Sequence, residues 1–193
     1  MAKISPAREN MLSAASALFR VRGYEGIGIA ELLEKSGAPR GSLYFHFPGG
    51  KEQIGSEVID GVAGRTAERF RELDESGVDI ATFIELVFKT TAKESKSCEF
   101  HGSCPIAAIA AGFGAEDKLL AKSVGNCFAG WEEAIATAAR RRGMSETNAA
   151  TFASAFLASM EGAFVLSKAQ RSTAPHINAS RAMQAYAASL LVN

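Results

Sequence analysis

Apolar residues recur at the three- and four-residue spacing of an α-helix along almost the whole chain. In the N-terminal part this spacing predicts a first helix that Pro6 opens and Gly23 ends. A short second helix is closed by Ser36-Gly37, because glycine readily adopts the left-handed conformation that ends helices. A third helix starts at Pro39 and stops at Pro48, so three helices fit into roughly the first fifty residues.

Six further helices are predicted in the remainder of the chain. Their expected ranges are Lys51 to about Leu73, Ile80 to Glu94, Pro105 to Gly114, Glu116 to Arg142, a helix capped by Ser145 that runs to about Arg171, and Pro175 to Leu191. The sequence shows no alternating strand pattern, internal repeat or low-complexity tract. The chain is therefore expected to be all-α, with about nine helices.

The second and third predicted helices, joined by Ser36-Gly37-Ala38, have the dimensions of a helix-turn-helix. In the third helix Leu43 and Phe47 would face the core, and the opposite face then carries polar and aromatic side chains. These are Arg40, Ser42, Tyr44, Phe45 and His46. An exposed face with two aromatic rings and several hydrogen-bond donors needs a partner, and we expect these side chains to contact DNA.

The donors on this face fit the major groove of DNA. Arg40 lies near the N-terminus of the third helix, from which it can reach base edges, and Gly41 permits a close approach. The hydroxyls of Ser42 and Tyr44 can hold phosphate oxygens, and His46 could add a further phosphate contact.

Lys51 is a candidate of a different kind. A cation in the first turn of a helix is disfavoured by the helix dipole unless an anion lies in front of it, and a DNA phosphate would be such an anion. The alternatives are that Lys51 is a solvated surface lysine and that Tyr44 is a half-buried packing residue. Residues 1–51 hold seven Lys and Arg against four Glu, although the formal net charge of the chain is zero, and this agrees with a phosphate-facing end.

The N-terminal part contains a highly specific string of residues. It comprises Gly23-Tyr24, Ile29, Gly37, the run Arg40-Gly41-Ser42-Leu43-Tyr44-Phe45-His46-Phe47, and Lys51-Glu52. This string resembles the TetR family of bacterial regulators. Within that family, Phe47-Pro48-Gly49-Gly50-Lys51-Glu52 and the later Cys104-Pro105-Ile106-Ala107-Ala108 resemble the LmrA/YxaF subgroup.

The resemblance implies two domains. Residues 1–50 would form a three-helix, helix-turn-helix DNA-binding domain, and residues 51–193 a six-helix ligand-binding and dimerisation domain. The last two helices would form a four-helix bundle with those of a second copy, giving a homodimer. The last helix has a small-residue surface that suits packing against a second copy or against an intrachain neighbour: Ala179, Ala182, Ala185, Ala187 and Ala188, with Leu190 and Leu191.

One position departs from the family pattern. Members usually have Thr or Ser as the cap of the second helix, and this chain has Ile27-Gly28 there. Glycine is an acceptable but weaker cap. The phosphate contact normally attributed to that hydroxyl is therefore not expected in this chain.

The second domain is rich in aromatic side chains, most of which must form its core. The resemblance implies a ligand cavity between its helices, and the sparse charge in Pro105–Gly114 and Phe152–Phe164 favours a lipophilic or aromatic molecule. Trp131 could provide an indole donor, and Phe128 and Phe164 a stacking surface. The candidate ligand contacts are Cys104, Phe113, Phe128, Trp131, Phe156, Met160 and Phe164.

Other classes of protein fit the sequence less well. Cys98-x2-His101-x2-Cys104 could serve a metal- or thiol-sensing regulator, but only three ligands lie close together, so no metal and no cofactor are expected. A helical small-molecule carrier without DNA binding is a further alternative. An enzyme is not expected, because the sequence has no phosphate-binding glycine loop, nucleophile elbow, paired-carboxylate motif or metalloprotease helix.

The sequence shows no run of about 18 uncharged apolar residues and no apolar export signal, so we expect a cytoplasmic protein with reduced cysteines and no membrane partner. The predicted function is that of a ligand-responsive transcriptional regulator. A homodimer would bind a pseudopalindromic operator in double-stranded DNA, act as a repressor, and be released by a small lipophilic or aromatic effector.

Overall fold

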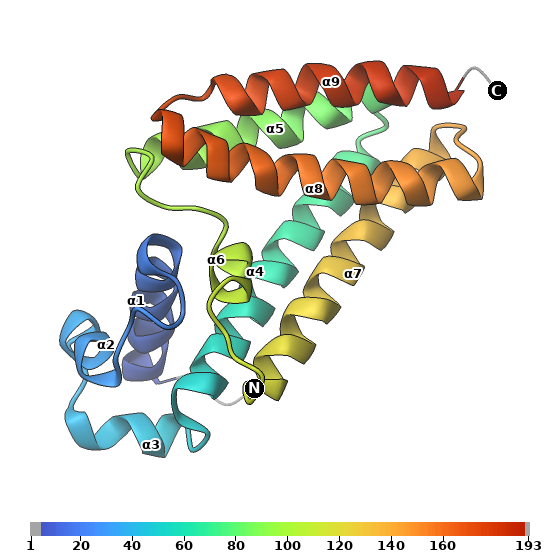
Figure 1. Cartoon of the computed structure of the whole chain (residues 1–193). Helices are drawn as coiled ribbons and strands as arrows, with labels where there is room; N and C mark the ends of the chain where they lie inside the picture. Colours follow the sequence, from blue (N-terminus) through green and yellow to red (C-terminus); the bar gives the residue numbers. More distant parts are fainter. Residues whose placement is uncertain (1–4, 192–193) are drawn as a thin grey trace. The chain divides into compact units, whose positions relative to one another are not determined.

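The computed structural model of the protein describes residues 5–191, which form nine α-helices and one short 3₁₀ turn and contain no strand (Figure 1). The expected all-α fold is confirmed. The described chain divides into two compact units, each with its own core. The first holds the residues up to Val62 together with Cys104–Cys127, and the second holds Ala63–Ser103 and the residues from Phe128 onward.

The first unit is built around the N-terminal helices. Its complete elements are α1 (Pro6–Arg22), α2 (Ile29–Ser36), the 3₁₀ turn η1 (Arg40–Ser42), α3 (Leu43–His46) and α6 (Pro105–Ala110), and it includes the first parts of α4 (Gly50–Glu75) and α7 (Lys118–Arg141). Helix α1 packs against α2 and α6. Two predicted boundaries are confirmed: Pro6 lies in the first turn of α1, and Gly37 ends α2 in the left-handed region with φ 66°.

The third helix differs from the prediction, because it is not a continuous α-helix from Pro39. Pro39 lies before the 3₁₀ turn in an extended conformation with ψ 140°. The amide of Ser42 donates to the carbonyl of Pro39 at 2.9 Å, which closes a three-residue turn rather than an α-turn. Only Leu43–His46 is α-helical.

The core of the first unit fixes the position of α3. Leu43 and Phe47 are both fully buried, and burial of one such side chain contributes about 1.5–3 kcal/mol to folding. Arg8 of α1 places its guanidinium carbon 4.9 Å from the centroid of the Phe47 ring and pairs with Glu57 of α4. The end of α3 is therefore tied to both α1 and α4.

The second unit contains α5 (Ile80–Ser97), α8 (Glu146–Gln170) and α9 (Ala174–Leu191), which pack side by side (Figure 1). Asp79 caps α5, because its carboxylate accepts a hydrogen bond of 2.7 Å from the backbone amide of Thr82. The predicted cap at Ser145 is confirmed, since its hydroxyl accepts the amide of Asn148 at 3.2 Å. Helix α9 begins at Ala174, one residue before the predicted Pro175.

An aromatic cluster joins α5 to α8. The ring centroid of Phe156 lies 6.4 Å from that of Phe83, 5.1 Å from that of Phe88 and 5.8 Å from that of Phe152. All four rings are buried. Among the described residues only α8 has the length and composition of a membrane span, and this cluster shows it to be a core helix of the unit.

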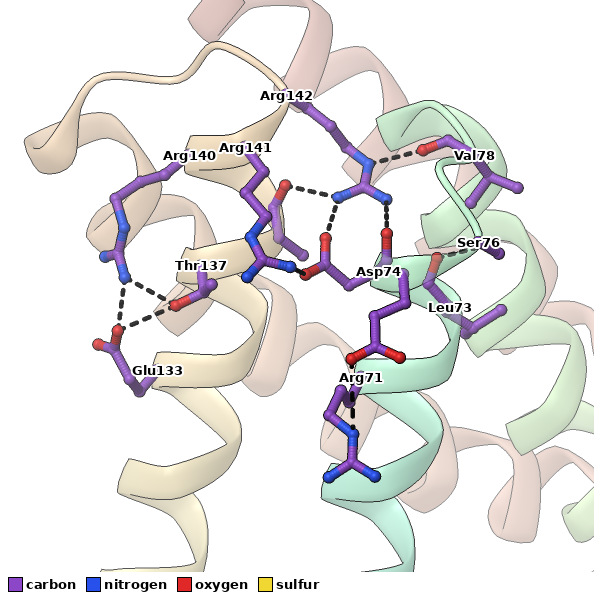
Figure 2. A network of polar contacts seen from close by, with 12 residues as sticks. Arg71, Leu73, Asp74, Ser76, Val78, Glu133, Thr137, Arg140, Arg141 and Arg142 are labelled. Atoms are coloured by element: carbon purple, nitrogen blue, oxygen red, sulfur yellow. Dashed lines mark hydrogen bonds and ion pairs between the residues drawn. The ribbon is translucent and has the colours of Figure 1, made fainter.

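The C-terminal ends of α4 and α7 meet at a buried carboxylate, Asp74 (Figure 2). Arg141 and Arg142 both pair with Asp74, and the side chains of Asp74 and Arg142 are only 8% and 11% exposed. Arg142 also donates to the carbonyls of Val78 at 2.7 Å and Ala138 at 2.8 Å. Almost all hydrogen-bond donors of the Arg142 guanidinium thus have acceptors, and they link the C-terminal ends of α4 and α7.

A buried histidine joins α9 to α5. Nδ1 of His176 lies 3.0 Å from the Thr91 hydroxyl, and Nε2 lies 2.9 Å from the Ser95 hydroxyl. The Thr91 hydroxyl also bonds the Phe88 carbonyl at 3.0 Å and donates its proton there, so it accepts from a protonated Nδ1, and Ser95 donates to Nε2. The neutral ring therefore satisfies both hydroxyls, and burial lowers the pKa of His176 to about 4.

This histidine predicts a loss of stability in acid. Its pKa is about 4 in the native protein and near 6.5 in the unfolded chain, so the unfolded state takes up a proton first as the pH falls. The stabilisation is complete above pH 6.5 and decreases down to about pH 4, by about 3 kcal/mol in total.

Urea unfolding at pH 7 and pH 4 measures this loss in the wild type and in His176→Gln, which cannot titrate. The variant should lose about 3 kcal/mol less than the wild type over that range. Equal losses in the two proteins would mean that another group is responsible.

Candidate nucleic-acid interface

The turn between α2 and α3 gives α3 two different faces. Gly37 reverses the chain with a positive φ, and Leu43 and Phe47 then point into the core. Tyr44 and Phe45 lie on the opposite face, with 61% and 79% of their surface exposed. The predicted exposure of both rings is confirmed, and the alternative of Tyr44 as a half-buried packing residue is wrong.

The residues before α3 add to this face a cationic side chain, that of Arg40, and a position without a side chain, Gly41. Arg40 and Gly41 are both exposed. The Ser42 hydroxyl, by contrast, donates to the Pro39 carbonyl at 2.7 Å. Its proton is therefore already used in the turn, and Ser42 can donate to a phosphate only after giving up that bond. His46 is half-buried, with its ring centroid 5.0 Å from that of Phe45.

Lys51, in the first turn of α4, is held by an aromatic ring. Its Nζ lies 4.1 Å from the centroid of the Tyr24 ring, and its side chain is half-buried. Tyr24 is buried, and this burial, with the nearby carboxylates of Asp117, Glu52 and Glu25, raises its pKa to about 12. The ammonium of Lys51 therefore has a neighbour within the protein, unlike that of a fully solvated lysine.

The N-terminal end of α4 is only partly capped by the chain. Gln53 accepts the amide of Gly49 at 2.9 Å through its side-chain oxygen, and Gly50 donates its amide to the Phe47 carbonyl at 2.8 Å. The amides of the following first turn point out of the helix, as at any helix start. Together with Lys51 they form a positive end that can accept an anion.

Three of the predicted ligand contacts lie in the interior of the second unit. Phe156, Met160 and Phe164 are all buried, and Phe164 packs edge-on against the His176 ring at 5.0 Å. Trp131 is also buried, and its indole N–H donates to the Ala63 carbonyl at 3.3 Å. The indole donor is therefore engaged in the protein itself.

The remaining predicted ligand contacts lie elsewhere. Phe128 is half-buried at the edge of a shallow groove between α7 and α8. Cys104 and Phe113 belong to the first unit, where α6 packs on α1, so the structure does not bring them into one unit with the other five. Cys98 and Cys104 likewise fall in different units, and no group of three or more metal-ligating side chains occurs in residues 5–191.

Sequence reasoning missed a basic groove between α5 and α9, lined by Lys89, Lys93, Lys96 and Arg181. The spacing of the three lysines along α5 was visible in the sequence as one stripe of a helix. The pairing of α5 with α9 was not, because the two helices are far apart along the chain.

A tight turn followed by a short helix with an exposed, donor-rich face is typical of a helix-turn-helix DNA-binding protein. Comparison with known proteins agrees with this class. Residues 11–58 match the description "Bacterial regulatory proteins, tetR family", and residues 80–182 match "Transcriptional regulator LmrA/YxaF-like, C-terminal domain". The chain belongs to the TetR family, with an LmrA/YxaF-like C-terminal domain. It is a transcriptional regulator and not an enzyme.

Similar proteins cover nearly the whole chain. The HTH-type transcriptional regulator LmrA of Bacillus subtilis is 30% identical over 173 residues, which are 90% of this chain and 92% of LmrA. A regulatory protein TetR from Rhodobacter sphaeroides has a similar structure, with a TM-score of 0.85 at 19% identity over 94% of this chain and 99% of that one. A cysteine mutant of the regulator CifR, complexed with a 26-base-pair operator, has a TM-score of 0.78 at 20% identity over 92% and 95% of the two chains.

Proposed function

We propose that two copies of this chain bind one pseudopalindromic operator in double-stranded DNA and repress transcription until a small lipophilic or aromatic effector releases them. The main support for DNA binding is that α3 has two different faces. Leu43 and Phe47 fix one face in the core, while Tyr44 and Phe45 are exposed on the other beside Arg40. Because the fold does not bury these two aromatic rings or the guanidinium, their exposure indicates a binding partner, and DNA fits them.

The side chains on this face have different roles on the duplex. Arg40 donates two parallel hydrogen bonds to the O6 and N7 of a guanine, and Gly41 lets the backbone approach the duplex. The Phe45 ring packs against a thymine methyl group. The Tyr44 hydroxyl and His46 contact phosphates, which orient α3 without reading sequence.

Lys51 and the start of α4 bind a backbone phosphate. The contact with the Tyr24 ring favours a Lys51 conformation near the positive end of α4, which lowers the side-chain ordering required when the phosphate arrives. The contact neutralises a phosphate and releases its counterion but touches no base, so it adds affinity without sequence preference.

Dimerisation uses α8 and α9. Val165 and Leu166 on α8 are large apolar side chains with 61% and 51% of their surface exposed. The predicted small-residue surface of α9 divides in two: Ala187 is buried within the chain, whereas the exposed alanines remain for a second copy. These are Ala182, Ala185 and Ala188. The CifR structure, with its bound operator, supports the DNA-binding assembly by analogy.

The predicted division at residue 50 assigns DNA reading to residues 1–50 and effector response to residues 51–193. Helix α4 supports a coupling between them, because it starts directly after α3 and is continuous to Glu75. The effector would favour the dimer state that binds operator poorly, and a coupling of about 1–3 kcal/mol would lower operator affinity about 5- to 150-fold. A regulator of this kind acts in the cytoplasm, where its DNA is.

Selection from a pool of random-sequence duplexes tests this function, because the protein itself then picks out the operator sequence. The purified chain should enrich a pseudopalindromic site, and sedimentation should show two copies on each selected duplex. Recovery of no enriched sequence, with the protein monomeric at micromolar concentration, would instead support a helical carrier that does not bind DNA.

A further inference from the structure

An open groove of about 750 Å³ runs between α5 and α9 in the second unit. This volume lies in the range of small-molecule sites. Most of the groove surface is apolar, and Phe88, Ala92 and Ile177 contribute to it. None of the side chains predicted to contact a ligand lines this groove.

The rim of the groove carries an excess of positive charge. Lys89, Lys93 and Lys96 project from one stripe of α5, and Arg181 comes from α9. The described residues contribute one carboxylate to the lining, that of Glu85. Within residues 5–191 none of the four cations makes an ion pair, whereas Arg69 and Arg140 do. Four cations against one carboxylate create a local field that attracts an anion.

The base of the groove is neutral. His176 lines it, and both ring nitrogens are used by the hydroxyls of Thr91 and Ser95. Because burial lowers its pKa to about 4, the ring carries no charge near neutral pH. The lining thus separates into an apolar and neutral floor and a cationic rim.

We propose that this groove binds a small amphipathic anion, whose apolar body lies on Ala92 and Ile177 and whose carboxylate meets the lysines of α5. The inference deepens the proposed function by giving a site and a charge to a ligand of the regulatory half. A second copy of the chain is a poor occupant, because α9 has no acidic residue and would bring Arg181 toward the lysines. A ligand with both an apolar body and a negative charge matches both parts of the lining.

Calorimetric titration of the DNA-free protein with three ten-carbon probes tests the proposal. Decanoate, decanol and decyltrimethylammonium share one apolar chain and differ in charge, and each is used below its micelle concentration. Decanoate should bind at least about tenfold more tightly than the other two, because only its head group meets the cationic rim. Equal affinities, or tighter binding of the cation, would overturn the proposal.

A charge-reversed variant places the binding in this groove. Lys89→Glu with Lys93→Glu should weaken decanoate binding about tenfold or more and leave decanol unchanged. The matched control is Lys118→Glu with Lys122→Glu, which reverses two exposed lysines at the same spacing on α7. An equal loss in both variants, or no loss in the first, would contradict the assignment. No DNA is present, so failed operator binding cannot be mistaken for failed ligand binding.

Discussion

Replacing Arg40 by alanine should produce the largest change in operator binding of any single substitution in η1 or α3. A bidentate contact from arginine to guanine is worth about 1–3 kcal/mol, and a homodimer loses one in each half-site, which gives about 2–6 kcal/mol in total. Affinity for the selected operator should fall at least about 30-fold. Fluorescence anisotropy with the operator and with duplexes changed at single positions measures both affinity and base discrimination.

Lys51→Ala is the comparison variant for Arg40→Ala. Because Lys51 meets only phosphate in this account, its removal should weaken binding to all sequences alike and reduce the salt slope by about one unit for each phosphate that is no longer neutralised. Arg40→Ala should lose discrimination at one base pair of each half-site. If both variants lost affinity uniformly over all duplexes, Arg40 would not read a base.

Asp74→Ala should cause the largest loss of stability among the polar residues. The substitution leaves Arg141 and Arg142, whose side chain is only 11% exposed, without their shared carboxylate (Figure 2). Removing one partner of a buried ion pair costs about 3–5 kcal/mol, because the remaining charge stays buried. In a chain of this size that corresponds to a decrease in Tm of roughly 6–20 °C, measurable by circular dichroism.

Arg71→Ala provides the matched control on the same helix. Arg71 pairs with Glu68 and Glu75, but its side chain is 60% exposed. Exposed ion pairs contribute about 0–1 kcal/mol, so its Tm should change by no more than a few degrees. Similar decreases for Asp74→Ala and Arg71→Ala would mean that the buried network does not stabilise the protein more than a surface pair.

The DNA-binding half was predictable because its signals are local. Gly37 marks the turn, and the spacing of Leu43 and Phe47 fixes which face of α3 is buried, so the exposure of Tyr44 and Phe45 follows. The 3₁₀ start of this helix was not predictable, because proline at position 39 is compatible with both an α-turn and a 3₁₀ turn.

The ligand contacts were less predictable because core and cavity residues have the same spacing. Phe156, Met160 and Phe164 recur every fourth residue on α8, as they would in either case, and all three are buried, which is expected of core residues and of residues around an enclosed cavity alike. The assignment of Cys104 to the first unit depends on which helices α6 packs against. The basic groove forms because α5 packs against α9, and no local sequence pattern predicts that these two helices pair.

Protection of guanine N7 from methylation by dimethyl sulfate tests the central claim, that two α3 helices read one operator, most directly. Guanine N7 lies in the major groove, so protection reports where α3 enters. The account predicts two protected segments on the selected operator, related by two-fold symmetry and centred about 34–36 Å apart or at a multiple of that spacing. A single protected segment, or two segments on opposite sides of the duplex, would contradict it.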